Sequence, residues 1–460
     1  MHTFSLKSIL RKKTAFIFVG VGLLMARFTP CYATDLMDVY HAALTHDAVY
    51  QAAVSTRLAT HEALPLSIAA LLPSVNAQAN VTSNYNTQAN VTSNYQATGF
   101  NPPITNQGYG VSLSQPLLNV GSWLQVQQAT CISKKADAVL GVAAQSLIYR
   151  VANAYFQVLL AQDTLRFAQA EKAANAQKLD QAQKRVRVGL DAITAVYEAK
   201  AAYDSAVAAE ISAQNTLRNN QEAIRQLTGQ TYSDLQGFHK TLPLFAPQPQ
   251  NVGPWIQSAI QYNLDLMASR YAVQIARKQI QVQASDHLPT LNLVGSYGRN
   301  NGINAGIIDG NSATVGVQLE LPIFAGGAIL SNTRKAEYDY QTAVAQLEDT
   351  YRKTIVTTRQ KYNDVLADIS SIQAERQAIQ SAQKSLQSTE ESVKAGTRTM
   401  VDVLLAQKNL YDAKRNAAKD QTQYLLDSLL LKQTAGLLQP ADLQHINQWM
   451  KNSDFAESRR

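Results

Sequence analysis

The sequence is poor in cysteine and in charge, and both shortages narrow the possible function. Only two cysteines, Cys31 and Cys131, occur in 460 residues, and 16% of the residues are charged. If the chain is cleaved after Ala33, a single cysteine remains, so an internal disulfide or a cysteine-based metal site is excluded. The sequence also has no run of eighteen uninterrupted apolar residues that would form a membrane-spanning helix.

Motifs for catalysis and cofactor binding are missing as well. The sequence contains no P-loop, GxGxxG, GxSxG or HExxH pattern, and its seven histidines are scattered. We therefore predict a protein that is not an enzyme and that carries no cofactor and no metal.

The excess of positive charge is confined to the N-terminus. Lys and Arg number 41 against 34 Asp and Glu, but residues 1–33 hold five of the positive charges and no acid. The remainder is nearly neutral, so binding of nucleic acid is not supported. Residues 1–33 combine a basic stretch, the apolar residues 15–25 and small residues before Thr34, which predicts a signal peptide. The alternative, a membrane anchor, is disfavoured because eleven apolar residues are too few to span a bilayer.

Two halves of the sequence repeat each other. Leu72-Pro73-Ser74 returns as Leu288-Pro289-Thr290, Val188-Gly189-Leu190 corresponds to Ala395-Gly396-Thr397, and Thr228-Gly229 corresponds to Ala435-Gly436. The shared order and the similar offsets predict two structural repeats. We place the first at 34–240 and the second at 255–436, with a proline-rich linker over 241–254 and a C-terminal tail over 437–460.

Long stretches without proline or glycine predict long helices. Proline is absent from 117–242 and 323–439, and glycine from 328–395. Apolar residues recur by threes and fours through 124–188 and 333–395, as in a coiled-coil seam. Each of these helices would be roughly 95 Å long at 1.5 Å per residue. Shorter helices are predicted over 36–70, 195–228, 255–286 and 402–435, so that two stacked short helices match one long helix.

Four segments alternate apolar and polar residues with a period of two. They lie around 74–81, 109–115, 291–297 and 315–321. Such strands fit a barrel wall between lipid and a wet lumen, and they also fit a half-buried sheet of a soluble protein. Export and the order of strands and helices favour the barrel. Because four strands cannot close a barrel, several chains must pool their strands.

A local duplication marks the first strand pair. Residues 78–85 recur as 88–95, and the corresponding connection of the second half, 298–312, is rich in Gly and Asn. We expect both connections to be exposed loops, where insertions are tolerated.

Several motifs resemble those of the TolC family of outer-membrane efflux proteins, over about residues 35–445. The pieces that carry the resemblance are Asp35-Leu36-Met37-Asp38-Val39-Tyr40, Ala154-Tyr155-Phe156-Gln157, Val188-Gly189-Leu190, His287-Leu288-Pro289-Thr290, Leu321-Pro322-Ile323-Phe324 and Gly396-Thr397-Arg398-Thr399-Met400-Val401-Asp402. The resemblance implies an α+β membrane protein, a homotrimer whose twelve-stranded β-barrel continues as a long α-helical coiled-coil barrel.

The resemblance also implies a function and partners. The trimer would lie in the outer membrane of a Gram-negative bacterium, in contact with lipid, and extend into the periplasm. It would be the exit duct for drug efflux or type I protein secretion, together with a periplasmic adaptor and an inner-membrane efflux pump or ABC transporter. The competing hypothesis is a soluble periplasmic coiled-coil scaffold, which would leave the amphipathic strands unexplained.

The resemblance places the functional residues at two helix reversals. The adaptor-docking tip would consist of Val188, Gly189, Leu190, Ala395, Gly396 and Thr397. The pore gate would include Arg398, which ties the second reversal to the region of Thr194, and Asp402, which lines the entrance.

Three gate positions depart from the family pattern. Leu405 stands where a second pore carboxylate is expected, Ala195 where an acidic partner is expected, and Val393 where an aromatic is expected. Asp191 is therefore our candidate for the carboxylate that pairs with Arg398.

Overall fold

A computed structural model describes residues 34–84, 104–232, 234–237, 243–302 and 310–452. The predicted signal peptide (1–33), the second copy of the duplication (88–95) and part of the predicted loop 298–312 therefore lie outside the described residues.

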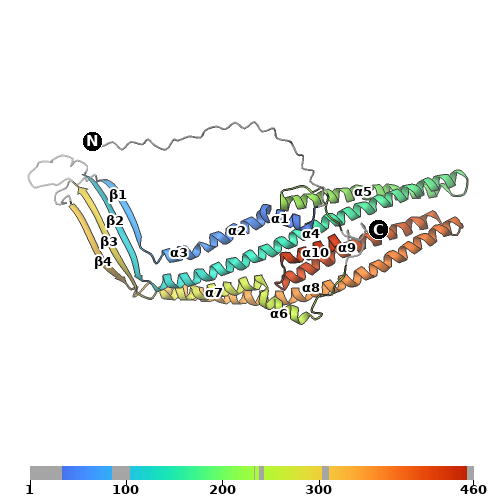
Figure 1. Ribbon diagram of the computed structural model, residues 1–460. Helices are drawn as coiled ribbons and strands as arrows, with labels where there is room; N and C mark the ends of the chain where they lie inside the picture. Colours follow the sequence, from blue (N-terminus) through green and yellow to red (C-terminus); the bar gives the residue numbers. More distant parts are fainter. Residues whose placement is uncertain (1–33, 85–103, 233, 238–242, 303–309, 453–460) are drawn as a thin grey trace, which may run out of the picture. The chain divides into compact units, whose positions relative to one another are not determined.

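The four predicted strands form one antiparallel sheet in sequence order (Figure 1). They are β1 (Ser74–Asn84), β2 (Ile104–Leu118), β3 (Thr290–Gly302) and β4 (Gly310–Glu320). The register aligns Ala77 with Val111, Val111 with Tyr297, and Tyr297 with Ala313, so one row of apolar side chains crosses all four strands. Val315 keeps 82% of its side-chain surface exposed, although it is apolar. The strands β1 and β4 are the edges of this sheet.

The long helices are longer than predicted, and each is continuous. Helix α4 spans Val120–Arg187 and α8 spans Ala328–Lys394, of 68 and 67 residues. Each is followed by one returning helix, α5 (Ile193–Thr228) and α9 (Met400–Thr434).

The predicted single helix over 36–70 is wrong, because the structure has three helices there. These are α1 (Leu36–His46), α2 (Ala48–His61) and α3 (Ala63–Ala69). Asp47 ends α1 and begins α2: its carboxylate accepts a hydrogen bond from the Tyr50 backbone N–H and pairs with Arg150 at 2.7 Å. An Asp at the N-cap position binds a free backbone N–H group in the first turn of the following helix. Because an N-cap residue has a non-helical backbone, the preceding helix ends there.

The predicted helix 255–286 is divided in the same way. Helix α6 (Val252–Tyr262) begins inside the predicted linker, and α7 (Leu264–Ser285) follows after Asn263. The Asn263 side chain accepts from the Leu266 N–H and donates to the Thr434 carbonyl at 2.9 Å. A side chain that binds both a helix start and a neighbouring helix end fixes the position of this break.

The region predicted as a tail contains a further helix. Helix α10 (Pro440–Asn452) packs its apolar face into the main core, where Leu443 and Met450 are fully buried. The same core includes Leu36 of α1, Tyr155 and Phe156 of α4, and Leu429 of α9. Segments from both ends of the described chain thus meet beside the middle of α4 and the C-terminal end of α9.

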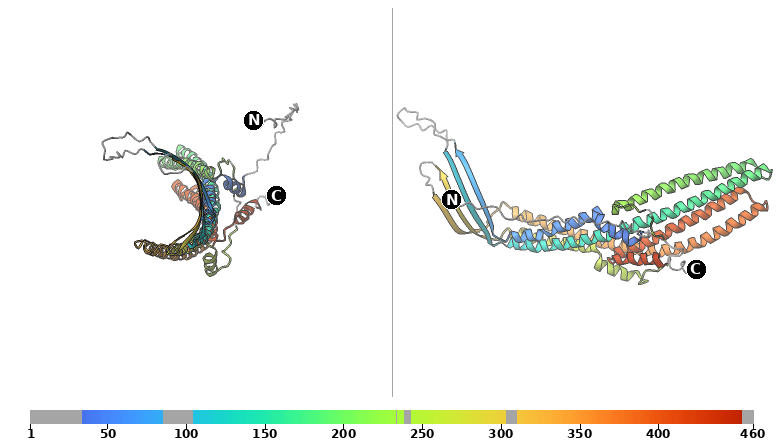
Figure 2. Two further views of the ribbon diagram at one scale, coloured as in Figure 1. Left: turned by 90° about the vertical axis from the view of Figure 1, so that its left-hand side faces the viewer. Right: turned by 45° about the horizontal axis from the view of Figure 1, so that its top comes forward.

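The long helices α4 and α8 are the centres of the helix packing. Helix α4 contacts α2, α3, α5, α7 and α9, while α8 contacts α6, α7 and α9. Figure 2 shows α6 and α10 on the convex side of the curve that the sheet makes. No helix in the described part of the chain combines the length and the apolar character needed to cross a membrane.

Candidate functional site

The two predicted reversals lie at the helix ends remote from the sheet (Figure 1). In the first, α4 ends at Arg187 and Gly189 adopts a left-handed conformation with φ of 74°. The N–H groups of Gly189 and Leu190 donate to the carbonyls of Val186 and Arg185, at 3.0 and 2.9 Å. Glycine suits this position because a side chain is strained at positive φ. The flanking Val188 and Leu190 are largely exposed.

An ion pair closes the first reversal. The Arg185 Nε atom lies 2.6 Å and its Nη2 atom 3.1 Å from the two carboxylate oxygens of Asp191. The hydrogen bond from Arg185 holds the pKa of Asp191 below its ordinary value. We had assigned Asp191 to Arg398, but within one chain its partner is Arg185.

The second reversal has the same backbone. Gly396 has φ of 76°, and its N–H donates to the Val393 carbonyl at 3.1 Å. The exposed Arg398 donates from Nη1 to the Thr389 hydroxyl at 3.3 Å. Thr194 is exposed, and the described residues show no hydrogen bond between it and Arg398.

Asp402 has a structural task that we did not predict. Its Oδ2 atom accepts hydrogen bonds from the N–H and the hydroxyl of Thr399, at 2.9 and 2.8 Å, and so caps the start of α9. These bonds, the backbone one first, lower the pKa of Asp402 and keep the carboxylate charged. The signal was present in the sequence, because Thr399 and Asp402 have the spacing of a capping box.

The three departures from the family pattern are accommodated differently. Val393 packs with Met400 and Val403 in a small buried cluster behind the turn. Leu405, one turn along α9 from Asp402, is 58% exposed. Ala195 is half-buried.

Polar contacts behind the tip join the two helical hairpins, and our sequence analysis missed them. Gln407 of α9 donates to Asn175 of α4 at 2.7 Å, and both side chains are buried. Lys178 pairs with Glu390 at 2.6 Å, joining α4 to α8. The two residues of each pair are more than 200 positions apart in the sequence and meet only in the folded chain, so only the expected packing of one repeat against the other could have suggested them.

The arrangement at the tip consists of turns, exposed side chains and charges. Within the described ranges, no group of three or more His, Cys, Asp or Glu side chains could hold a metal ion. The described tip presents two glycine turns, exposed apolar side chains and one capped, ionised carboxylate.

Comparisons with known proteins agree with this arrangement. The family described as "Outer membrane efflux protein" matches residues 39–230 and 255–437. The outer membrane protein TolC of Vibrio cholerae is 36% identical over 441 residues, which are 95% of this chain and 98% of that protein. The alkaline protease secretion protein AprF of Pseudomonas aeruginosa is 28% identical over 444 residues, covering 95% and 91%.

Solved structures share the fold. The crystal structure of the outer membrane protein VceC from Vibrio cholerae matches with a TM-score of 0.72 at 21% identity, over 87% of this chain and 96% of that chain. The α+β fold class predicted from the sequence is thus confirmed. So are the predicted outer-membrane location and the role in efflux and secretion, whereas the soluble periplasmic scaffold is not favoured. The matching family is named for efflux, and AprF is named for protease secretion. This chain belongs to the outer membrane efflux protein family.

Proposed function

We propose that three copies of this chain form one exit duct, in which twelve strands cross the outer membrane and the helices enclose a periplasmic passage. The passage would connect, through a periplasmic adaptor, to an inner-membrane efflux pump or ABC transporter. The single observation that carries the proposal is that the sheet has two unpaired edge strands, β1 and β4, and that each edge strand is joined to a helix, α3 or α8, at the same end of the sheet.

Both edges are suited to pairing with another copy. Strand β1 follows α3, and strand β4 precedes α8. Apolar side chains are exposed on both sides, including Leu58 and Leu66 on α2 and α3 and Tyr338 and Val356 on α8. An exposed, unpaired strand edge is a template for pairing, and a head-to-tail contact that closes gives a ring. The α8 side of one copy would therefore pack on the α2–α3 side of the next.

The mass of the purified protein tests this assembly. In detergent, the protein should have about three times the mass of one mature chain, and the trimer should resist dissociation by mild SDS. Tyr338→Asp places a charge in the proposed contact and should reduce the trimer, whereas Glu337→Asp, its exposed neighbour, should not. A monodisperse, folded monomer with native β-sheet content would refute the shared barrel.

The two reversals are the proposed docking surface for the adaptor. A Cβ atom at Gly189 or Gly396 would meet nothing within 4 Å, so the space in front of both turns is open. Exposed apolar residues at such a tip favour contact with a partner helix. The tested variants are Gly396→Asn, which tolerates positive φ, and Gly396→Trp, which adds bulk.

We expect Gly396→Asn to retain drug export or protein secretion and Gly396→Trp to lose most of it, with equal amounts of trimer in the outer membrane. Co-purification of the adaptor should fall in parallel with export. Normal export by the Trp variant at normal abundance would show that the adaptor binds elsewhere.

The gate is proposed to combine a tie at Arg398 with a ring of Asp402 carboxylates, one from each copy. Among the described residues, Arg398 donates one side-chain hydrogen bond, to the Thr389 hydroxyl, and a guanidinium has five N–H donors, so the exposed group can also donate to a neighbouring copy. An exposed link of this kind is worth about 0.2–1 kcal/mol, so three copies resist opening only weakly. Docking of an adaptor could therefore overcome the tie.

Single-channel recording in planar bilayers tests the gate. Arg398→Ser should raise conductance, and Asp402→Asn should weaken cation preference and block by multivalent cations. Arg187→Ser, an exposed Arg at the other reversal, is the matched control. If both gate variants conduct like the parent protein, the constriction lies elsewhere. Because Leu405 adds an apolar rather than an acidic layer, multivalent block should be weaker than in relatives with two acidic layers.

A further inference from the structure

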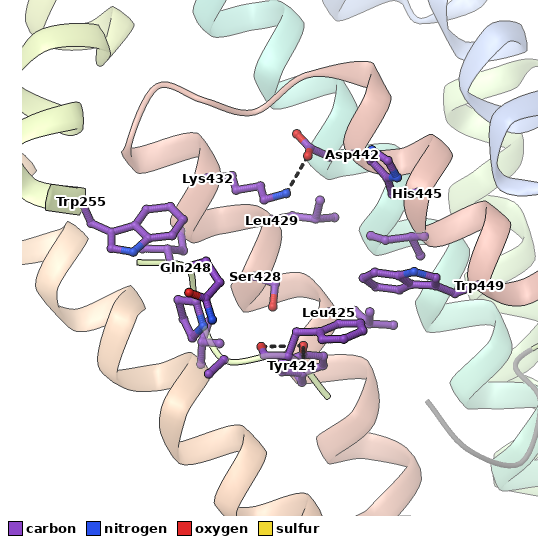
Figure 3. Close-up of a pocket in the computed structure, with 16 residues that line it drawn as sticks. Gln248, Trp255, Tyr424, Leu425, Ser428, Leu429, Lys432, Asp442, His445 and Trp449 are labelled. Carbon is purple, nitrogen blue, oxygen red and sulfur yellow. Dashed lines mark hydrogen bonds and ion pairs between the residues drawn. The ribbon is translucent and has the colours of Figure 1, made fainter. Parts of the chain in front are cut away.

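A cavity of about 360 Å³ lies far from both reversals, where the segment 243–251 meets α6, α8, α9 and α10. Figure 3 shows the side chains that line it, and its volume is within the range of small-molecule sites. Because α6 and α10 lie on the convex side of the sheet's curve, the cavity is separate from the proposed passage (Figure 2). Its occupant would therefore not be cargo in transit.

The walls combine aliphatic side chains with four large aromatic ones, and the aromatic ones come from four separate segments. Trp255 belongs to α6, Tyr424 to α9, Trp449 to α10 and Phe245 to the connecting segment. The Phe245 and Trp449 rings are 5.6 Å apart with an angle of 44°. Aromatic faces from several directions favour a flat apolar ligand that can stack against them.

Two of these rings are held by hydrogen bonds to the backbone of the connecting segment. The Trp255 Nε1 atom donates to the Pro249 carbonyl at 3.0 Å. The Tyr424 hydroxyl accepts from the Phe245 N–H at 2.9 Å and donates to the Phe245 carbonyl at 3.1 Å. Because these polar atoms are already bound, the ring faces are positioned before any ligand arrives, which lowers the entropic cost of binding.

The charges at the cavity neutralise each other. Lys432 and Asp442 line it and form an ion pair at 2.6 Å, and Asp442 also accepts from the Gln439 N–H. An ionic ligand would have to compete with this pair, so a neutral one is favoured. A hydrogen-bonding group remains at Gln248, whose exposed amide stands between Trp255 and Tyr424 in Figure 3.

We propose that this cavity binds a neutral, planar aromatic molecule of about the size of an indole ring with one polar substituent. The ligand would lie against the aromatic side chains of the walls and join the connecting segment and α10 to α9. This proposal does not depend on how the chains assemble or on the position of the gate.

Tryptophan fluorescence tests the proposal directly, because two of the three tryptophans in the chain line the cavity. In a Trp123→Phe background, the protein emission comes from Trp255 and Trp449 alone. The full-length protein in lipid nanodiscs is titrated with 5-nitroindole, a neutral planar probe that absorbs where tryptophan emits. We expect saturable quenching of this emission, whereas a tryptophan ester in empty nanodiscs should show only linear quenching from partitioning of the probe.

Two cavity variants and one matched control locate the binding. Ser428→Phe fills the cavity and Trp449→Ala removes a wall, and each should weaken binding by about tenfold or more, equivalent to a loss of about 1.4 kcal/mol. Ser205→Phe, on the exposed surface of α5, should leave the affinity unchanged. Trimer mass and circular dichroism verify assembly, and if one cavity variant does not assemble, the other decides. Purely linear quenching, or saturable quenching with the same affinity in the assembled cavity variants, would overturn the proposal.

Discussion

Replacing Gly436 with alanine should impair the protein far more than the same change at the two tip glycines. Gly436, Gly189 and Gly396 have nearly the same backbone, with φ of 72°, 74° and 76°. Each ends a helix in the left-handed conformation. The intrinsic cost of placing alanine there is about 1–2 kcal/mol per residue and is the same at all three positions.

The surroundings differ. A Cβ atom at either tip glycine meets nothing within 4 Å, whereas at Gly436 it would overlap the Tyr262 carbonyl and lie 2.7 Å from the Asn263 nitrogen. This backbone forms the break between α6 and α7, which the Asn263 side chain ties to Thr434 at 2.9 Å. A backbone shift would add about 1–3 kcal/mol of overpacking and about 1 kcal/mol for a weakened hydrogen bond. The total, about 3–6 kcal/mol per chain, is a large part of the usual free energy of unfolding of a domain, about 5–15 kcal/mol.

The assay is the amount of SDS-resistant trimer in outer membranes and the temperature at which it dissociates. Gly189→Ala and Gly396→Ala should lower that temperature slightly and leave the amount near the parent level. Gly436→Ala should reduce both strongly. A Gly436→Ala protein as abundant and as heat-resistant as Gly396→Ala would refute the inference from close backbone approach.

Three further predictions concern charged groups. Burial, followed by repulsion from nearby carboxylates, raises the pKa of Asp368 from 3.8 to about 7. The folded protein therefore holds this proton more tightly than the unfolded chain, so the contribution of Asp368 to the free energy of unfolding is fully present below about pH 4 and is lost as the pH rises through 7. Asp368→Asn should flatten the pH dependence of trimer dissociation over this interval, and an unchanged profile would contradict the assignment. Thr399→Val removes one hydrogen bond to Asp402 and should raise its pKa, so that cation selectivity in bilayers is lost at a higher pH than in the parent protein. Arg150→Met leaves the buried Asp47 carboxylate without its partner and should cost about 1–3 kcal/mol, measured by thermal dissociation; a cost near zero would show that the helix break does not need the ion pair.

The strands and the long helices could be predicted because their signals are local. Alternation with period two and the absence of proline and glycine can be recognised from neighbouring residues alone. Each pattern also occurs in both repeats, so the prediction for one repeat supported the prediction for the other. The breaks at Asp47 and Asn263 were missed because they depend on distant partners, Arg150 and the Thr434 carbonyl. An Asp or Asn side chain that binds the N–H three residues later is a recognised cap, so the local half of each signal was available.

The candidate site was predictable in position but not in its contacts. Glycine in a helical sequence marks the reversals, yet the pairing of Arg185 with Asp191 depends on how the turn folds. Helix α10 could have been found, since Leu443, Ile446 and Met450 follow helical spacing after Pro440, which is favourable at a helix start.

The two reversals, similar in backbone and different in their polar contacts, have a consequence for symmetry. If a ring were built from six copies of a single repeat, all six turns would be chemically identical and would respond alike to any force at the entrance. In the proposed trimer, a chain with two unlike reversals would give three turns closed by an internal ion pair, Arg185 with Asp191, and three begun by the Thr399–Asp402 cap. Selection can then alter one set without disturbing the other. In a ring of this kind, three turns can stay in place while the other three move, so opening requires fewer contacts to break than if all six turns moved together.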